Sequence, residues 1–473
     1  MSVLKEHFGS RLGFVLAAAG SAVGIGNLVG FPVAAAKNGG GAFLIIYAFL
    51  VLCVCLPVML AEISLGRNTQ QSPLGAYRTL SKRSFWWQLV GWLVLVTPYM
   101  IAVFYMVITV WILGYLCEAA TGQLSALAEP EYFGQFVNSN KIFGYFAIVV
   151  LLVNVILLGG VKNGIERAAK IMMPALCLML AGLVVFVLTL DNAYAGLVYY
   201  LVPDFSKINA AVINGALSQA FFSLSLGMGI MITYGSYISR HEKLAGSAKL
   251  VAAMDTAVAF FAGLMVIPAI FSFNPNIDTA ALSDSSVALI FTFLPKIFLA
   301  LQAVIGYVGA SVVATLFFLL VFFAAITSLV SITEVPVSSL VNERGYSRGR
   351  ALLILTLTMA LLTIACILSF GRVAFLSEFM VYAGQSKALF EVIVDVFYET
   401  ILPLNGFLLC LFVIYRWKKQ GFNAELECSD PAYKGSLLER YVNVSLGTFI
   451  PLILLLIFIN TVLLKYFGIS LIG

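Results

Sequence analysis

Long apolar segments separated by short polar connections recur along the whole chain. Most of them have the roughly 20 residues that a helix needs to cross a hydrocarbon core of about 30 Å. The pattern therefore predicts eleven membrane-spanning helices, which we place at about residues 11–36, 41–65, 86–117, 142–160, 165–190, 212–239, 247–272, 304–341, 350–370, 388–416 and 437–467.

The first apolar segment carries small and polar residues at its centre. Gly20, Gly24 and Gly26 lie there, followed by Asn27. Each glycine costs about 1 kcal/mol in a helix interior, so we expect this helix to open. Open backbone at bilayer depth is tolerated beside a cavity, where freed carbonyls bind cations. The alternative is close packing of another helix against the small residues.

The sixth segment repeats this feature with Ser223, Ser225, Gly227 and Gly229. Segments one and six each begin a group of five, and five crossings invert the topology. Two such groups are typical of inverted repeats whose broken helices meet at the midplane. This match favours a binding site over close packing. We expect repeats at 1–190 and 191–418, and a loop with one extra helix at 419–473.

The composition indicates an all-α polytopic membrane protein. Hydrophobic residues make up 62% of the chain and charged residues 10%, with a mean hydropathy of +1.03. So few charges would not cover the surface of a soluble domain. The seven cysteines lack metal-ligand spacing. Because no nucleophile–base pair, metal cluster or phosphate loop is evident either, we do not expect an enzyme.

Lysine and arginine are distributed unevenly between the two sets of connections. If the N-terminus is cytoplasmic, 20 of the 27 basic residues lie on the cytoplasmic side. This asymmetry predicts a cytoplasmic N-terminus and, after eleven crossings, a C-terminus outside. The net charge of +5 then reflects topology and not nucleic-acid binding. The residues placed outside are Lys37, Lys141, Lys207, Lys296, Arg372, Lys387 and Lys465.

Several motifs together resemble the neurotransmitter:sodium symporter family, and most closely its bacterial amino-acid branch. The resemblance covers spans one to ten. It rests on the run 18–28, Phe31-Pro32, the segment 38–43, Glu62 with Gly66-Arg67, the run 219–229 and Thr327-Ser328.

This resemblance implies a sodium-coupled symporter of the bacterial inner membrane that works by alternating access. The implied substrate is a neutral aliphatic or aromatic L-amino acid, and the protein is implied to lie in a lipid bilayer. The alternatives are a different small amine or amino acid carried by the same mechanism, or a channel. Glu62 is implied to cap backbone N–H groups exposed by the unwinding.

Two sodium ions are implied beside the substrate, held by hard oxygen donors that suit an alkali cation. The hydroxyls of Thr327 and Ser328 have an ordinary alternative, which is to bond back to their own helix. The resemblance assigns the first ion to Ala22, Asn27, Ser223 and Asp255, and the second to Gly20, Val23, Ala324, Thr327 and Ser328.

The substrate site is implied to pair both ends of an α-amino acid with fixed polar groups, since unpaired buried polar ends are costly. An apolar pocket without charge would hold the side chain, and flexible Met228 favours larger guests. The implied residues are Ser21, Ala22, Gly24, Ile25, Gly26, Ile101, Tyr105, Phe222, Ser223, Ser225, Met228, Ser328 and Ile332.

Chloride is not expected as a cofactor. Animal members hold chloride with four side chains, and Tyr47, Gln219 and Ser223 keep three of these positions. The fourth aligns with Ala259, which has no hydroxyl, while Asp255 lies one turn earlier on the same face. Its carboxylate is implied to replace the chloride charge. Without sodium it is expected to take up a proton, giving proton counter-transport.

The gates depart from the family pattern. Gly30 stands where an external-gate arginine is usual, so we expect Asp395 to lack a facing cation. Aromatic closure by Tyr105 and Phe222 is expected in its place. At the cytoplasmic gate, Lys5 replaces the usual arginine.

Overall fold

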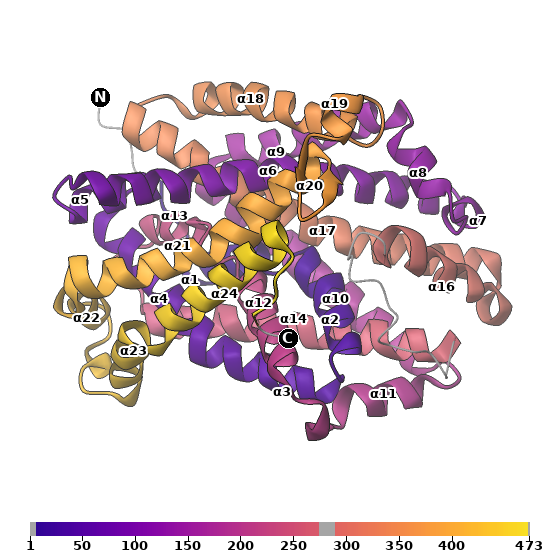
Figure 1. Ribbon diagram of the computed structural model, residues 1–473, viewed down its shortest axis with the longest axis horizontal. Coiled ribbons are helices and arrows are strands. Elements are labelled where there is room, and N and C mark those ends of the chain that lie inside the picture. The colour runs from indigo at the N-terminus through magenta and orange to yellow at the C-terminus, as the bar shows by residue number, and fades with distance from the viewer. Residues whose placement is uncertain (1–5, 274–288, 472–473) are drawn as a thin grey trace.

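The computed structural model describes residues 6–273 and 289–471, and their regular structure is almost entirely helical (Figure 1). In this part of the chain, nine helices are long and apolar enough to cross a membrane, or ten if one bent pair counts as a single span. The protein is therefore a multi-pass helical membrane protein. The predicted sixth span is not among them because it consists of two short helices, as described below.

The first predicted span is broken, as the sequence indicates. Helix α1 (Arg11–Ala22) begins at Ser10, whose hydroxyl accepts a hydrogen bond from the N–H of Gly13 at 3.0 Å. It ends at Val23, which has φ −68° and ψ 103°. A second half, η1 (Gly26–Gly30) with α2 (Phe31–Lys37), continues at an angle of 55° to the first.

The sixth predicted span is broken at the matching place. Helix α12 (Ala210–Ser223) and helix α13 (Ile230–Ser236) are separated by non-helical residues. Ser225, Gly227 and Gly229 have φ values of 52°, 78° and 70°. A side chain at Gly227 would place its Cβ 2.6 Å from the carbonyl oxygen of Leu402, so this turn requires glycine.

The other elements of the first half of the chain follow the predicted spans within a few residues, and short helices lie in the connections. Their bounds are α3 (Gly41–Leu50), η2 (Val51–Cys55), α4 (Leu56–Thr69), α5 (Pro73–Leu80), α6 (Phe85–Ala120), α7 (Leu124–Leu127), α8 (Tyr132–Val137), α9 (Lys141–Leu158), η3 (Val161–Glu166) and α10 (Arg167–Leu188).

Within the described residues, the second half of the chain adds five helical segments long and apolar enough to cross a membrane. It also contains a small antiparallel hairpin in which Met380 pairs with Lys387. The bounds are α11 (Ala193–Leu201), η4 (Phe205–Lys207), α14 (Leu244–Phe273), η6 (Leu289–Phe293), α16 (Leu294–Ala300), α17 (Gln302–Arg344), α18 (Arg348–Leu368), α19 (Ala374–Ser377), β1 (Met380–Tyr382), β2 (Gln385–Lys387), α20 (Leu389–Ile393), η7 (Val394–Thr400), α21 (Ile401–Leu411), η8 (Phe412–Lys418), α22 (Lys419–Glu427), η9 (Pro431–Tyr433), α23 (Leu437–Gly447) and α24 (Phe449–Phe467).

The broken helices pack against long ones, and the residues at both breaks are largely buried. Helix α1 packs against α10, α14 and α17, and α6 runs along α17. The short helices α7, α8 and α16 lie at one end of the long helices, and α5 and α22 lie at the other (Figure 1). Both breaks are therefore surrounded by protein, which is the setting that open backbone requires in a membrane.

Glycines let the second half of the sixth span approach α4 closely. A Cβ at Gly66 would lie 1.8 Å from the carbonyl oxygen of Ile232, and one at Gly235 would lie 2.4 Å from that of Ile63. Each helix thus contributes a glycine to a backbone-to-backbone contact of the kind that small residues permit.

We predict that Gly66→Ala prevents α4 and α13 from docking. Overpacking a tight contact costs about 1–3 kcal/mol, and more where backbone blocks relaxation. The melting temperature of the purified variant, followed by fluorescence size-exclusion chromatography, should fall sharply. Gly182→Ala is the control, because no atom lies within 4 Å of a Cβ at that helical position. Equal melting temperatures for the two variants would contradict the close contact.

Candidate ion and substrate site

Asn27 links the two broken spans and α14. Its amide oxygen accepts a hydrogen bond from the N–H of Gly24 at 3.1 Å. Its amide nitrogen donates to Ser223 Oγ at 2.8 Å and to Asp255 Oδ1 at 2.7 Å. All three side chains are buried. Three of the residues predicted for the first sodium site, Asn27, Ser223 and Asp255, therefore lie together at the junction of η1, α12 and α14.

The carboxylate of Asp255 lies among neutral partners. Besides the Asn27 amide, it accepts from the hydroxyl of Ser223 at 2.9 Å and from that of Tyr47 at 3.2 Å. The ion pairs within residues 6–273 and 289–471 do not include it. A fully buried carboxylate in such surroundings gains strongly from a nearby cation.

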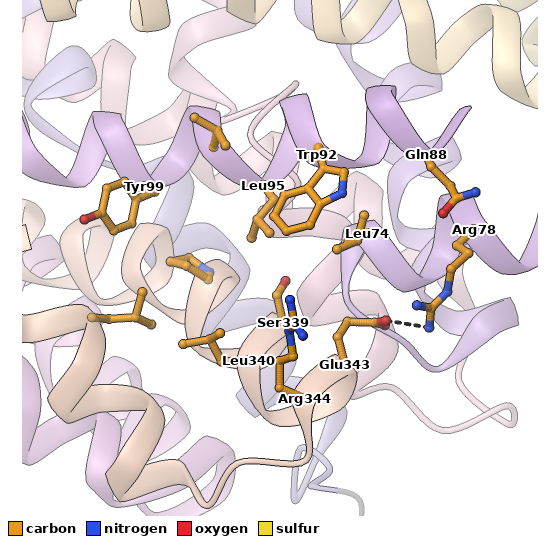
Figure 2. Close-up of a pocket in the computed structure, with 13 residues that line it drawn as sticks. Leu74, Arg78, Gln88, Trp92, Leu95, Tyr99, Ser339, Leu340, Glu343 and Arg344 are labelled. Carbon is orange, nitrogen blue, oxygen red and sulfur yellow. Dashed lines mark ion pairs between the residues drawn. The ribbon is translucent and has the colours of Figure 1, made fainter. Parts of the chain in front are cut away.

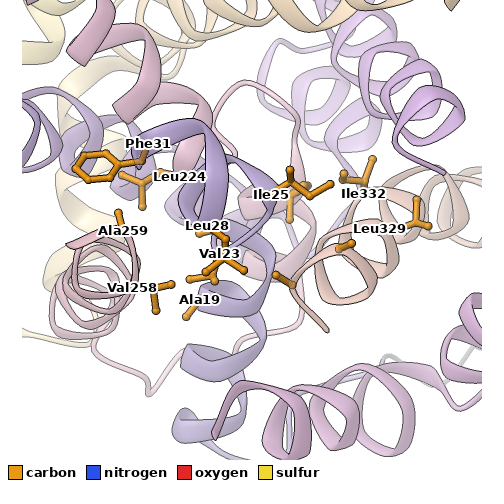
Figure 3. Close-up of a cluster of buried hydrophobic side chains, with 14 of the residues drawn as sticks. Ala19, Val23, Ile25, Leu28, Phe31, Leu224, Val258, Ala259, Leu329 and Ile332 are labelled. Atoms are coloured by element: carbon orange, nitrogen blue, oxygen red, sulfur yellow. The ribbon is translucent and has the colours of Figure 1, made fainter. Parts of the chain in front are cut away.

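Two further positions that correspond to the chloride site of animal members also lie near Asp255. Gln219 donates its amide to the carbonyl oxygen of Gly26 at 2.9 Å. Ala259 is fully buried, and Figure 3 shows it beside Phe31 and Leu224. The fourth position is therefore apolar, and the negative charge of this region comes from Asp255.

A second group of oxygens forms where α17 meets the break in the first span. The Ser328 hydroxyl lies 3.5 Å and 3.3 Å from the carbonyl oxygens of Gly20 and Val23, and 3.2 Å from that of Ser21. Thr327 bonds back to its own helix, to the carbonyls of Phe323 and Ala324 at 3.0 and 3.1 Å. Ser328 thus crosses to the open backbone, whereas Thr327 follows the ordinary pattern of a helical hydroxyl.

The polar residues predicted for the substrate border the same breaks. The N–H of Ile25 donates to the Tyr105 hydroxyl at 3.4 Å, and the Ser225 hydroxyl donates to the carbonyl oxygen of Ser21 at 3.0 Å. A Cβ at Gly24 would lie 2.9 Å from the Tyr105 oxygen and 3.0 Å from Ser328 Oγ. Gly24 therefore lets the side chains of α6 and α17 reach the broken segment.

The predicted apolar residues lie in the core around these groups. Ile25, from the break in the first span, and Ile332, from α17, lie near each other in Figure 3. Ile101 and Met228 are buried in the same core, together with Ala22. None of these predicted pocket residues has a charged side chain.

Phe222 has an aromatic partner that the sequence did not indicate. Its ring stacks on Tyr398 of η7 with 4.8 Å between centroids, and Tyr398 also contacts Phe104 at 5.7 Å. Tyr398 gives no sequence signal, because its position opposite Phe222 depends on how the tenth span packs against the sixth. The stacking partner of Phe222 is therefore Tyr398.

Side chains hold both polar groups of Gly227 in the unwound segment. Glu62 Oε1 accepts from its N–H at 2.8 Å, which is the capping contact that the resemblance implied. Asn405 donates to its carbonyl oxygen at 2.8 Å and to Thr97 Oγ1 at 3.1 Å. Asn405 and Thr97 were not predicted, although a lone asparagine in the middle of a span is itself a signal of buried polar contact.

The expectation that Asp395 lacks a cation is wrong. Lys465 of α24 lies 3.2 Å from its carboxylate, and the hydroxyl of Tyr382 donates to it at 2.5 Å. Lys465 also pairs with Glu399 at 2.6 Å. The cation comes from the last helix, which lies outside the ten spans covered by the resemblance. The other gate residue, Lys5, lies outside the described residues.

We predict that Lys465→Met weakens the packing of α24 on η7. It leaves the carboxylates of Asp395 and Glu399, whose side chains are 8% and 29% exposed, without their common cation. The loss should be about 1–3 kcal/mol, between the values for exposed and buried pairs. Thermal unfolding should show a lower melting temperature. Adding Asp395→Asn and Glu399→Gln should restore most of the loss, and failure to restore it would contradict an electrostatic role.

At the opposite end, a network joins the N-terminal segment to the helix bundle. Arg348 pairs with Glu334 at 2.5 Å and with Glu6 at 3.4 Å, and the Tyr237 hydroxyl donates to Glu334 at 2.7 Å. Glu6 also accepts from the N–H of Val161 at 2.7 Å. The members of this ionic network were not predicted from the sequence.

Comparison with known protein families identifies the family to which the chain belongs. The family model described as "Sodium:neurotransmitter symporter family" matches residues 5–129 and 135–466. The chain belongs to the sodium:neurotransmitter symporter family. Its membership makes it a sodium-dependent transporter and not an enzyme.

Individual members of the sodium:neurotransmitter symporter family extend the match. An uncharacterized sodium-dependent transporter of Bacillus subtilis, YhdH, is 33% identical over 466 residues, which are 96% of this chain and 97% of the relative. The creatine transporter of Torpedo marmorata is 25% identical over 60% of this chain and 54% of its own length. The crystal structure of MhsT in complex with L-phenylalanine superposes with a TM-score of 0.81 at 36% identity, covering 96% of this chain and 99% of MhsT.

Proposed function

We propose that this transporter carries a neutral hydrophobic L-amino acid into the cell together with sodium, by alternating access. Support comes from MhsT, whose structure contains L-phenylalanine, and from the uncharged character of the predicted pocket residues. An acidic or basic guest would need a buried partner of opposite charge, and these residues supply none. A different small amine or amino acid carried in the same way is the second candidate.

The proposed first sodium site uses Asn27, Ser223, Asp255 and the carbonyl of Ala22. The observation that carries it is the Asp255 carboxylate, which is buried and held by an amide and two hydroxyls, with no cationic partner in the described part of the chain. A sodium ion would supply the missing charge. The proposed second site uses the Ser328 hydroxyl with the carbonyls of Gly20 and Val23, and it requires Thr327 and Ala324 to turn toward the same ion.

The carboxylate also explains why we propose chloride-independent transport. Two sodium ions and a zwitterionic amino acid would leave the site positive, and an anion nearby offsets that charge strongly at low dielectric. Asp255 provides a fixed anion, while Ala259 offers no hydroxyl to a chloride ion. Uptake into proteoliposomes with gluconate in place of chloride should therefore be unchanged. A wild-type protein that stops without chloride would refute this part of the proposal.

The proposed arrangement in the membrane follows the basic residues. The N-terminus would lie in the cytoplasm and the C-terminus outside, in the inner membrane of a bacterium. Residues 1–190 and 191–418 would form the two inverted repeats, each beginning with one of the broken spans, and residues 419–473 would add the last helix.

We predict proton counter-transport on the empty return step. After sodium has left, Asp255 would be a buried anion without a cation, and taking up a proton removes that cost. With a pH dye trapped in the liposome lumen, sodium-driven uptake should raise the internal pH, since protons leave as the carrier returns. The Asp255→Asn variant should show no such change. A constant internal pH during rapid wild-type uptake would contradict the proton role.

A further inference from the structure

A cavity of about 500 Å³ lies apart from the ion and substrate residues, at the end of the molecule where α5 leads into α6. Its walls come from α5, α6, α17 and α18. Figure 2 shows Trp92, Leu95 and Tyr99 of α6 across from Leu340 and Arg344 of α17. None of the residues lining this cavity is among those assigned above to sodium, substrate or gates.

The α6 wall of the cavity continues an apolar surface that faces outward. Trp92 is 48% exposed and Val96 38%, and they lie one helical turn apart. Phe85 and Leu89 extend the same stripe with exposures of 66% and 45%. On a helix that crosses the membrane, such a stripe contacts acyl chains. The cavity therefore borders the lipid phase along α6.

Aromatic residues place the cavity near the lipid headgroups. Trp86, at the first turn of α6, is 74% exposed, and tryptophan at the end of a spanning helix marks the membrane–water interface. Trp92 lies less than two turns deeper into the membrane on the same helix. A ligand filling this cavity would thus have one end at headgroup level and the other in the hydrocarbon region.

The polar end of the cavity has an excess of positive charge. Arg78 pairs with Glu343 at 2.5 Å, which neutralises one arginine (Figure 2). Within residues 6–273 and 289–471, Arg344 has no carboxylate partner. The turn between α5 and α6 adds Lys82 and Arg83, both exposed. Basic pockets between spanning helices suit anionic headgroups.

We propose that this cavity binds an anionic phospholipid, with its phosphate at Arg344 beside the Arg78–Glu343 pair and an acyl chain along Trp92, Leu95 and Val96. The apolar wall gives a free phosphate ion nothing to bind, and the unpaired arginine gives a zwitterionic lipid no advantage. The amphiphilic lining and the lipid-facing stripe fit one ligand class, a lipid with net negative charge.

The test uses the full-length transporter in detergent and phosphatidylglycerol with brominated acyl chains, which quench tryptophan on contact. Quenching should saturate, and brominated phosphatidylcholine should bind more weakly. Trp92→Phe should remove most of the saturable quenching, because Trp92 lines the cavity. Arg344→Gln should weaken phosphatidylglycerol by about fivefold, the effect expected for one cation at the headgroup level, and leave phosphatidylcholine unchanged.

Arg350→Gln is the matched control. Arg350 is also exposed at this end of the molecule, but it lies over the Tyr346 ring at 4.5 Å and does not line the cavity. Its replacement should leave both lipids unaffected. Equal binding of the two lipids, unchanged affinity in Arg344→Gln, or saturable quenching that survives Trp92→Phe would overturn the proposal. Displacement of the lipid by millimolar inorganic phosphate would instead identify a soluble-anion site and also overturn it.

Discussion

Replacing Asp255 by asparagine together with Ala259 by serine is expected to make transport depend on chloride. The asparagine removes the fixed negative charge, and the serine supplies the hydroxyl that the apolar fourth position lacks. Tyr47, Gln219 and Ser223 remain in place around it. Without chloride, uptake by the double variant should fall about tenfold or more, equivalent to roughly 1.4 kcal/mol of lost charge stabilisation.

The measurement is initial uptake in proteoliposomes with chloride or gluconate on both sides. Chloride should restore much of the activity of the double variant and change the wild type little. Asp255→Asn alone is the control for the added hydroxyl. It lacks the charge, as the double variant does, but it has no serine to hold chloride. A double variant that remains active in gluconate would show that the charge of Asp255 is dispensable.

Removing an oxygen ligand from either proposed sodium site should weaken sodium binding more than any change in the pocket. Asn27→Ala also leaves Asp255 and Ser223 without a donor that lies within 2.8 Å of each. Hydrogen bonds to charged groups are worth about 1.5–3 kcal/mol, so the sodium concentration for half-maximal uptake should rise about ten- to a hundredfold. Thr327→Ala should raise it through the second site.

The matched control for the second site is Thr315→Ala on the same helix. Like Thr327, Thr315 bonds back to its own helix, with its hydroxyl 2.7 Å from the carbonyl of Ser311. It is not among the predicted ligands, so its loss should not alter sodium affinity. If Thr327→Ala behaved like Thr315→Ala, Thr327 would be only a helical hydroxyl, as its present hydrogen bonds show.

The sequence predicted the breaks because their cause is local. Gly20, Gly24 and Gly26 weaken a helix wherever they occur, and the same weakness recurs at Gly227 and Gly229. Glu62 could be placed as well, since a carboxylate inside a span needs donors and an unwound neighbour provides them. Local chemistry, read with the family resemblance, was therefore enough to find the place where the spans open.

The partners of Asp395 and Phe222 could not be predicted in the same way. The Lys465–Asp395 pair and the Phe222–Tyr398 stack join residues far apart in the chain, and each depends on how spans pack. The absence of an arginine at Gly30 suggested a missing cation, whereas the fold supplies one from α24. The role of Asn405 could not be predicted for the same reason, because it depends on a hydrogen bond to the distant carbonyl oxygen of Gly227.

Sodium-driven accumulation of a neutral amino acid tests the central claim most directly. The purified protein would be reconstituted into liposomes and offered labelled phenylalanine with an inward sodium gradient, or with sodium equal on both sides. We expect accumulation above the external concentration only with the gradient, and competition by neutral hydrophobic amino acids but not by glutamate or lysine. Equilibration to the external level under both conditions would indicate a passive pore and contradict sodium-coupled symport.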